Sequence, residues 1–346
     1  IVFGDWSSDV CSSDLRVNMP PRALMLAPMV ELSHQALREL IAGFGGCDRY
    51  YTEMTGAPAY LAEAPYDRWF LNSEPDPANT VVQFFSPDAP RMAGAVRKLA
   101  AERAAEGRPL GGIDLNFGCA APQIERIGGG VRWMREPEAA AAMMAEVRAA
   151  IPGVPLSAKL RLGYEDSWER LHSFCAGLVA AGADYLVLHP RLKDQKFRRT
   201  GKWDYVKRLA EALPVPVIGN GDVRDYPSYR KAIDEHGAAG VMLGREAVRR
   251  PWIFALIRAK EEDGSASLDI SIEETGLAML ELIRTRLPDS FHLSRARRFF
   301  FHYCDNLSFG HHVRFAIQNA PDLQAIERLF RAYFDEVPAE RVKRQD

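Results

Sequence analysis

Residues that can bind a ligand or move a proton follow several short apolar runs of this sequence. Lys159 and Arg161 end one run, His189 ends another, and Asn116 ends a third, just before Cys119. A thiol with an ordinary pKa of about 8.5 is mostly protonated at neutral pH, so Cys119 can serve as a general acid or, if its pKa falls, as a nucleophile. The sequence leaves both roles open.

Cys119 stands in a loop where a thiol has room to move. Gly118 precedes it, Pro122 follows it, and a run of glycines occupies 128–130. A cysteine that only fills a core is more typical of an apolar helix, which is the position predicted for Cys175. We therefore expect Cys119 to be a functional residue.

Two glycine-containing segments predict a phosphate site. Gly219-Asn220-Gly221-Asp222 follows one apolar run, and Gly244-Arg245 follows the next. Glycines let a backbone come close to a ligand, and an arginine can bind two phosphate oxygens. Either segment alone is also typical of an ordinary turn. In a parallel barrel, however, the loops after the last two strands commonly hold a phosphate.

Lys159 and Arg161 are two positions apart, so in a strand they point to the same face. A buried ammonium group is costly without a partner, which favours contact with an electron-rich edge or carbonyl of a cofactor over a surface position. His189 is placed to donate to the same cofactor, although a single histidine is more often a hydrogen-bonded structural residue.

The elements that must position these residues alternate regularly along the chain. Strands are predicted at 23–27, 49–53, 80–84, 112–116, 156–160, 185–189, 215–219 and 240–243, and helices between them at 91–106, 137–150, 167–181, 204–212 and 226–236. Eight apolar strands separated by helices predict an α/β fold, a (β/α)8 TIM barrel, whose active site lies at the carboxyl ends of the strands. A dinucleotide-binding open sheet is disfavoured, because 219–224 lacks the third glycine of that fingerprint and follows a late strand.

The pattern changes after Pro251. It predicts helices only, at 252–262, 272–287, 293–306 and 323–336, and the polar stretch 263–271 is typical of a linker. We predict a non-native or disordered tail at 1–18, a catalytic barrel at 19–263, and a C-terminal all-helical domain at 264–346.

Composition bounds the function classes. Of the 346 residues, 47% are hydrophobic, and 44 Lys and Arg face 46 Asp and Glu, so disorder is excluded and no overall charge attracts a polyanion. Five cysteines without a C-x-x-C pair argue against a disulfide scaffold or a zinc site, so we predict no metal and a cytoplasmic protein. No membrane contact is predicted, because no apolar run reaches the roughly 18 residues that span a bilayer.

Together the motifs resemble those of the tRNA-dihydrouridine synthases, flavin enzymes that reduce the C5=C6 bond of uridines in tRNA. The matching stretches, in order, are LAPM (26–29), YTEM (51–54), VVQFF (81–85), IDLNFGC (113–119), IGGG (127–130), SAKLRLG (157–163), LVLHPR (186–191), PVIGNGDV (216–223) and GVMLGREAVRRPWIF (240–254). Each stretch is modest alone, and their order makes the resemblance specific.

The resemblance implies a bound FMN that NADPH or NADH reduces. It makes Cys119 the acid that protonates C5 of uracil while hydride reaches C6, and it places Asn116 against the target base. The cofactor contacts that it implies are Pro28, Met29, Val30, Gln83, Lys159, His189, Asn220, Gly221, Asp222, Gly244 and Arg245. Ala120 and Pro190 depart from the usual pattern, which bears on the choice of uridine more than on the reaction.

A tRNA partner requires local positive charge, and two basic segments supply it. The predicted tRNA contacts are Arg191, Lys193, Arg198, Arg199, Arg295 and Arg298. They are expected to contact phosphates, whereas the aromatic run at 299–303 is better explained as helix core. Two alternatives stay open: a flavin barrel dehydrogenase acting on a free pyrimidine or other small molecule, and an RNA-binding module without catalysis. We expect a monomer.

Overall fold

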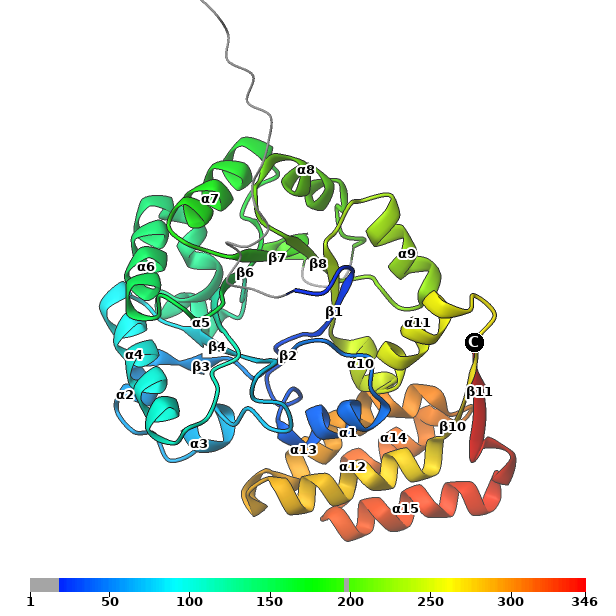
Figure 1. Cartoon of the computed structure of the whole chain (residues 1–346). Helices are drawn as coiled ribbons and strands as arrows, with labels where there is room; N and C mark the ends of the chain where they lie inside the picture. Colours follow the sequence, from blue (N-terminus) through cyan, green and yellow to red (C-terminus); the bar gives the residue numbers. More distant parts are fainter. Residues whose placement is uncertain (1–18, 196–198) are drawn as a thin grey trace, which may run out of the picture.

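The structure is a computed structural model of the chain that describes residues 19–195 and 199–346. The predicted tail at 1–18 lies outside the described residues. Figure 1 shows a ring of strands surrounded by helices, with further helices packed on one side. The barrel strands are β1 (Ala23–Leu26), β2 (Tyr50–Tyr51), β3 (Thr55–Gly56), β4 (Thr80–Phe85), β5 (Ile113–Phe117), β6 (Leu156–Gly163), β7 (Tyr185–Leu192), β8 (Val217–Asn220) and β9 (Gly240–Leu243).

The strands close into the predicted TIM barrel. All pairs are parallel in the order β1-β9-β8-β7-β6-β5-β4-β2, and β3 also pairs with β4, so β2 and β3 share one position of the ring. The ring closes through a parallel bridge between Met25 and Arg49, where Leu26 N–H donates to the Arg49 carbonyl at 2.9 Å. The (β/α)8 prediction is therefore confirmed.

Helices follow the strands along the outside of the ring. They are α1 (Gln35–Phe44), α2 (Ala57–Leu61), α3 (Asp67–Phe70), α4 (Ala89–Ala105), α5 (Pro122–Arg126), α6 (Pro137–Ala150), α7 (Trp168–Ala180), α8 (Asp204–Ala212), α9 (Tyr226–Asp234), α10 (Arg245–Arg249) and α11 (Ile253–Glu262). Several begin at a capping residue: the side chains of Asp88, Ser167 and Asp225 each accept from the backbone N–H three residues later, which satisfies an otherwise unpaired donor.

The strands differ from prediction in two places. Of the expected strand at 49–53, only β2 forms; the chain then leaves the sheet, and the second short strand, β3, lies beyond the expected range. β6 and β7 end at Gly163 and Leu192, later than expected, because Arg161 and Arg191 continue the strands as buried residues, and the charge of Arg191 is paired with Asp222.

The C-terminal region is helical, with an added two-stranded ribbon. Its helices are α12 (Ile272–Arg286), α13 (Asp289–Tyr303), α14 (Gly310–Asn319) and α15 (Leu323–Glu336). The antiparallel ribbon joins β10 (Leu268–Ser271) to β11 (Val342–Gln345). The expectation of helices alone after Pro251 missed this ribbon, and part of the expected linker forms β10. α14 was also not predicted.

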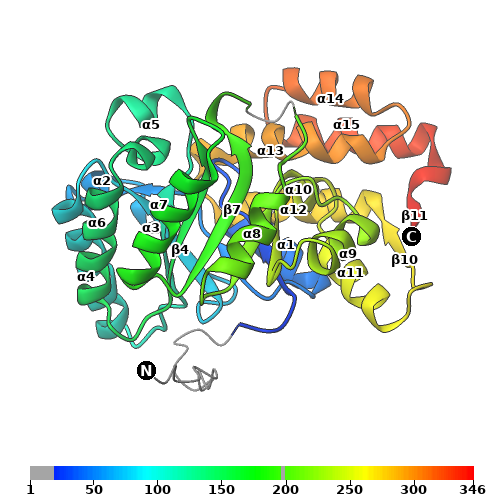
Figure 2. The same cartoon turned by 90° about the horizontal axis from the view of Figure 1, so that it is seen from above.

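One apolar cluster joins the barrel to the C-terminal helices. Trp252, ahead of α11, packs edge-on against Tyr303 of α13 at 6.3 Å between ring centroids. α1 packs against α12 and α10 against α13. The aromatic run of α13 is core where Phe299 and Phe300 are buried, whereas Phe301 is exposed. Figure 2 shows α5 and α13–α15 toward the same end of the molecule. The domain division at residue 263 stays a prediction.

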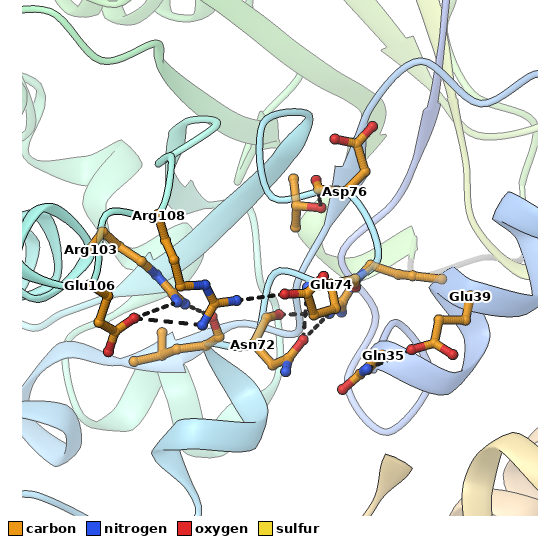
Figure 3. Close-up of polar contacts among 11 residues, drawn as sticks. Gln35, Glu39, Asn72, Glu74, Asp76, Arg103, Glu106 and Arg108 are labelled. Carbon is orange, nitrogen blue, oxygen red and sulfur yellow. Dashed lines mark hydrogen bonds and ion pairs between the residues drawn. The ribbon is translucent and has the colours of Figure 1, made fainter. Parts of the chain in front are cut away.

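Arginines hold the loop that leads into β4. Buried Arg38 of α1 donates to the carbonyls of Asn72 at 2.6 Å and Glu74 at 2.9 Å, and Arg108 donates to Glu74 Oε1 at 2.8 Å. Figure 3 shows Arg103 and Arg108 beside this loop, which borders a cavity of about 220 Å³. Because the loop precedes β4 and Arg108 precedes β5, the network braces the amino end of the barrel, away from the predicted site.

Candidate active site

The Cys119 loop begins where β5 ends, and the side chain of Asn116 holds its backbone. Asn116 Oδ1 accepts hydrogen bonds from the N–H of Cys119 at 2.9 Å and of Gly118 at 3.2 Å. The Cys119 carbonyl accepts from the N–H of Val131 at 3.0 Å. Cys119 therefore has a fixed backbone although it lies outside any helix or strand.

The Cys119 thiol is partly buried, and its surroundings keep it protonated. Burial raises its pKa above the ordinary value, while a backbone hydrogen bond from Ala121 and the charges of Arg161 and Lys159 oppose this shift. A protonated thiol near two cations is suited to donate a proton, because the cations stabilise the thiolate that is left. Of the two roles that the sequence left open, this arrangement favours the acid.

A buried hydrogen-bond chain lies beneath Asn116, inside the barrel. Asn116 Nδ2 donates to Gln83 Oε1 at 3.0 Å and approaches the sulfur of Met54 at 3.4 Å. Gln83 Nε2 donates to Asp114 Oδ2 at 2.7 Å. Ser157 Oγ donates to Asp114 Oδ1 at 2.6 Å. Gln83, which the resemblance placed against the cofactor, thus has both ends of its amide bonded within the protein.

Lys159, Arg161 and His189 face the inside of the barrel. Leu160 and Leu188, which alternate with them along β6 and β7, belong to the apolar cluster under the helices. Successive side chains of a strand point to opposite faces, so the three polar residues point inward, as the alternation predicted for Lys159 and Arg161. Arg161 pairs with His189 in the strand register.

These groups create a strongly positive region. Burial and the charge of Arg161 lower the pKa of Lys159 to about 8, and burial with nearby Arg191 lowers that of Arg161 to about 10. Burial lowers the pKa of His189 far below its ordinary range, and the charges of Arg161, Lys159, Arg191 and Arg245 act in the same direction. Four cations around one neutral imidazole suit an anionic or electron-rich ligand. Among the described residues, no group of three His, Cys, Asp or Glu side chains gathers as metal ligands would.

The loop after β8 brings its backbone close to the same region. Gly221 has a φ of +111°, and a Cβ there would lie 3.1 Å from the ring of His189 and 2.9 Å from the Arg191 guanidinium. Neighbouring Asn220 is buried, and its amide donates to the Met242 carbonyl of β9 at 2.7 Å. Only glycine fits at 221 without strain, because the backbone there lies against His189 and Arg191; the predicted approach to a ligand stays a prediction.

Arg191, which was predicted to contact tRNA, is buried beneath this loop and is not exposed on the surface. Its guanidinium forms an ion pair with Asp222, lies 2.8 Å from His189 Nε2, and donates through Nε to the Arg199 carbonyl at 2.5 Å. The Asp222 carboxylate also accepts from the N–H of Gly201 at 2.7 Å. Arg191, with 3% exposure, therefore braces the loops after β7 and β8.

The loops after β1 and β9 meet at the same end of the barrel. A Cβ at Gly244 would lie 3.4 Å from the Met29 sulfur, and the Met29 N–H donates to Ser33 Oγ at 2.9 Å. Pro28 and Met29 are partly buried, whereas Val30 is half exposed. Arg245 is exposed at the first residue of α10. The structure thus gathers the predicted cofactor residues from β1 and from β9.

Lys193 bonds to the helix that follows the Cys119 loop. Its ammonium lies 2.7 Å from Glu125 Oε2 of α5 and 4.9 Å above the Tyr164 ring, and the Tyr164 hydroxyl donates to Glu125 Oε1 at 2.7 Å. Tyr164 and Lys193 follow β6 and β7, so Glu125 links three loops. Arg199 is exposed, and Arg198 lies outside the described residues.

Arg295 and Arg298 of α13 face the loop after β1. Arg295, with 7% exposure, pairs with Glu31 at 3.2 Å, and its guanidinium lies 4.6 Å above the Phe291 ring. Arg298 is half exposed and lies 3.9 Å from Glu31. The Glu31 N–H donates to buried Glu53 at 2.6 Å. Arg295 therefore joins the C-terminal helices to the barrel rim, whereas Arg298 is open to a partner.

The basic segment at 191–208 carries less free charge, in its described part, than its composition indicated. Arg191 pairs with Asp222, Lys193 with Glu125, and Lys202 with Asp166.

Sequence reasoning also missed two acidic residues of the site, Asp114 and Glu125. Asp114 had a visible signal, a charged residue in an otherwise apolar strand, but its partner Gln83 is 31 positions away.

Two comparisons by sequence indicate one family, and a comparison by structure shows the fold. The sequence profile of a family described as "Dihydrouridine synthase (Dus)" matches residues 25–337. The tRNA-dihydrouridine(16) synthase of Cupriavidus necator is 36% identical over 249 residues, covering 70% of this chain and 76% of that protein. The tRNA-dihydrouridine(16) synthase of Pseudomonas syringae pv. tomato is 32% identical over 243 residues, with 69% and 75% covered. The solved structure of histamine dehydrogenase from Rhizobium sp. 4-9 shares the fold, with a TM-score of 0.51, 12% identity and coverage of 78% of this chain and 51% of that one.

Proposed function

The chain belongs to the dihydrouridine synthase family and is thus a flavin-dependent oxidoreductase, and we propose that it reduces the C5=C6 bond of uridine 16 in tRNA to 5,6-dihydrouridine. We propose FMN as the flavin and NADPH or NADH as its reductant. The observation that carries the proposal is the position of the partly buried Cys119 thiol, on a loop fixed by Asn116 and beside the cations at the carboxyl ends of the strands. Position 16 rests on the names of the relatives.

The residues at this end of the barrel fit FMN. Lys159 and Arg161 offer inward positive charge for the ring system, and His189 is neutral. Exposed Arg245 and the backbone of Gly221 would hold the phosphate, which the other cations around His189 also favour. When bound, the reduced flavin supplies the hydride that C6 of uracil accepts.

Cys119 supplies the proton for C5. Its S–H bond breaks as the C5–H bond forms, and the resulting thiolate is stabilised by Arg161 and Lys159. Because burial raises the thiol pKa, the thiolate takes a proton back from solvent at neutral pH. Asn116 fixes the loop through its carbonyl oxygen. By its resemblance to the family it would also contact the target base.

The substrate backbone would contact cations that the protein leaves accessible. Arg199 and Arg298 are exposed, and Lys193 is partly exposed beside Glu125. Arg295 acts indirectly, since it holds Glu31 and is itself buried. The target uridine has to leave its stack to reach the barrel, which costs a few kcal/mol unless it already lies in a loop.

The test is a modification assay with position mapping. The flavin-loaded protein is incubated with dihydrouridine-free tRNA and NADPH, and reduced uridines are mapped; reduction at position 16 is expected. Cys119→Ala should retain flavin and nearly abolish product. Cys47→Ala is the matched control, because Cys47 precedes β2 at the other end of the barrel and should leave the rate unchanged.

One alternative function shares the flavin site. A flavin barrel dehydrogenase for a free pyrimidine would use the same cations and a cysteine but would not need the C-terminal helices. Reduction of no tRNA uridine by the flavin-loaded protein, together with turnover of a free pyrimidine, would replace the proposal by this alternative.

No helix among residues 19–195 and 199–346 is long and apolar enough to cross a bilayer. The monomeric state and the cytoplasmic location stay predictions.

A further inference from the structure

Asp114 is a fully buried carboxylate that the mechanism above does not use. It lies on β5 with 0% exposure, two residues before Asn116 and on the same inward face. Its two oxygens accept from Gln83 at 2.7 Å and from Ser157 at 2.6 Å. Burial raises its pKa to about 6, so the carboxylate is ionised above that pH. A buried charge is costly, and its retention here calls for a reason.

The carboxylate sets the direction of the hydrogen bonds that reach Cys119. An ionised carboxylate can only accept, so Gln83 must turn its NH2 group toward Asp114. Gln83 Oε1 then faces Asn116, which must present its own NH2 group at 3.0 Å. Asn116 Oδ1 is thereby left to accept from the Cys119 N–H at 2.9 Å. If Asn116 were turned the other way, an N–H group would face the backbone N–H of Cys119, and the bond would be lost.

We propose that Asp114 is a positioning residue for Cys119, acting through the orientations of Gln83 and Asn116. This rests on the proposed function, in which Cys119 is the acid, and adds to it a residue that touches neither the thiol nor the base. The effect is directional: it depends on which partner donates at each step, and not only on the space that Asp114 fills.

The direction can be broken and restored by exchanging one acid for one amide. Gln83→Glu sets two carboxylates against each other, so both cannot be charged and accept at once. In Gln83→Glu with Asp114→Asn, the new amide donates to the new carboxylate, which still accepts from Asn116, so the direction returns and the net charge is unchanged. In Asp114→Asn alone, Ser157 can accept a hydrogen bond from the new amide, so this variant should have an intermediate effect.

The readouts are kcat for tRNA reduction and the rate at which iodoacetamide alkylates Cys119, located by peptide mass spectrometry in the flavin-loaded protein. We expect Gln83→Glu to lower kcat about hundredfold and the added Asp114→Asn to recover at least about tenfold, with Cys119 alkylation changing in parallel. Flavin content is measured in each variant, because Gln83 is also a predicted cofactor contact.

A pH profile separates direction from packing. In Gln83→Glu the two carboxylates can share one proton, which restores a donor, so activity should fall as pH rises and this dependence should vanish in the double variant. The other groups facing Asp114 are Lys159, Tyr51 and Tyr185, which are the same in all variants. Ser157→Ala is the packing control, since it removes a bond to Asp114 but leaves the direction toward Cys119; its kcat should stay within about threefold.

The proposal is overturned if the double variant is no better than Gln83→Glu, or if Ser157→Ala impairs Cys119 as much as Gln83→Glu does. Should Gln83→Glu alone not fold, the double variant still decides, because the proposal requires that Cys119 alkylation with both residues changed stays within about tenfold of the wild-type rate. Failure of the proposed function is separate: it shows as full activity of Cys119→Ala, whereas Cys119 alkylation reports positioning without reference to activity.

Discussion

The carbonyl oxygen of Cys119 occupies the space where a side chain would begin at Gly130. A Cβ built on Gly130 would lie 2.4 Å from that oxygen and 3.1 Å from the Cys119 Cβ. Gly130 also has a φ of +61°, in the left-handed region. The glycine run at 128–130 therefore lets the chain turn back against the Cys119 loop, where Val131 N–H bonds to the same carbonyl.

Gly130→Ala should displace Cys119. The contact with a backbone oxygen cannot be relieved by a rotamer change, so the loop must move, and a shift of about 1 Å can lower the rate about hundredfold. The measurement is kcat for tRNA reduction with flavin content unchanged. Gly153→Ala is the control, because nothing lies within 4 Å of its Cβ position. Equal activity of the two variants would contradict the role of Gly130.

The pH dependence of Cys119 alkylation should decide between acid and nucleophile. Only the thiolate reacts with iodoacetamide, and burial raises the pKa of the Cys119 thiol above its ordinary value. The rate should therefore be low at pH 7 and rise to half its maximum only above pH 9. A midpoint below about 8.5 would indicate an activated thiolate and a nucleophilic role instead.

Lys159 should destabilise the protein while flavin is absent. Burial lowers its pKa from 10.5 to about 8. Between pH 8 and pH 10.5 the unfolded chain therefore binds one more proton, on Lys159, than the folded chain does. The cost is complete below pH 8, declines as pH rises, and is gone above 10.5. Flavin-free Lys159→Met should melt a few degrees higher than wild type at pH 7, with the difference narrowing above pH 8, and should bind flavin more weakly. A lower melting temperature for this variant at pH 7 would contradict the argument.

Arg191 and Arg298 should respond differently to removal. Arg191→Ala leaves Asp222 without its ion-pair partner, which should cost about 1–3 kcal/mol of stability, less than for a fully buried pair because Asp222 is partly exposed. Arg298→Ala should leave the melting temperature unchanged and raise KM for tRNA, more strongly at low salt. Thermal melting and steady-state kinetics measure both, and a raised KM without loss of stability in Arg191→Ala would restore the original prediction of an RNA contact.

The barrel was predictable because its strands are apolar runs of strand length, and their spacing leaves room for helices. The ends of β6 and β7 were not predictable, because a charged residue after an apolar run is typical of a loop, and only the structure shows that Arg161 and Arg191 are buried strand residues. The ribbon of β10 and β11 joins segments about 70 residues apart, and neither four-residue strand has a strong pattern of its own.

The site was predictable in part for the same reason. Inward residues such as Lys159 stand out against an apolar strand. The contacts between loops depend on register and on loop conformation, which no local pattern carries: Gln83 meets Asp114 across β4 and β5, and Lys193 meets Glu125 across 68 positions. In the sequence, Arg295 is only a cationic residue before an aromatic run. The sequence could not show whether its side chain is exposed to RNA or buried in an ion pair with Glu31.

Lys193 and Glu125 should act as a pair on the Cys119 loop. If their ion pair steadies α5, Lys193→Met and Glu125→Gln should each lower kcat/KM, and the double variant should lose less than the sum, with a coupling of about 0.5–1 kcal/mol for a partly exposed pair. Lys202→Met and Asp166→Asn give a matched control pair on other loops, which should leave Cys119 alkylation unchanged. If Lys193 instead serves only a tRNA phosphate, its effect should be confined to KM, be largest at low salt, and add fully to that of Glu125→Gln.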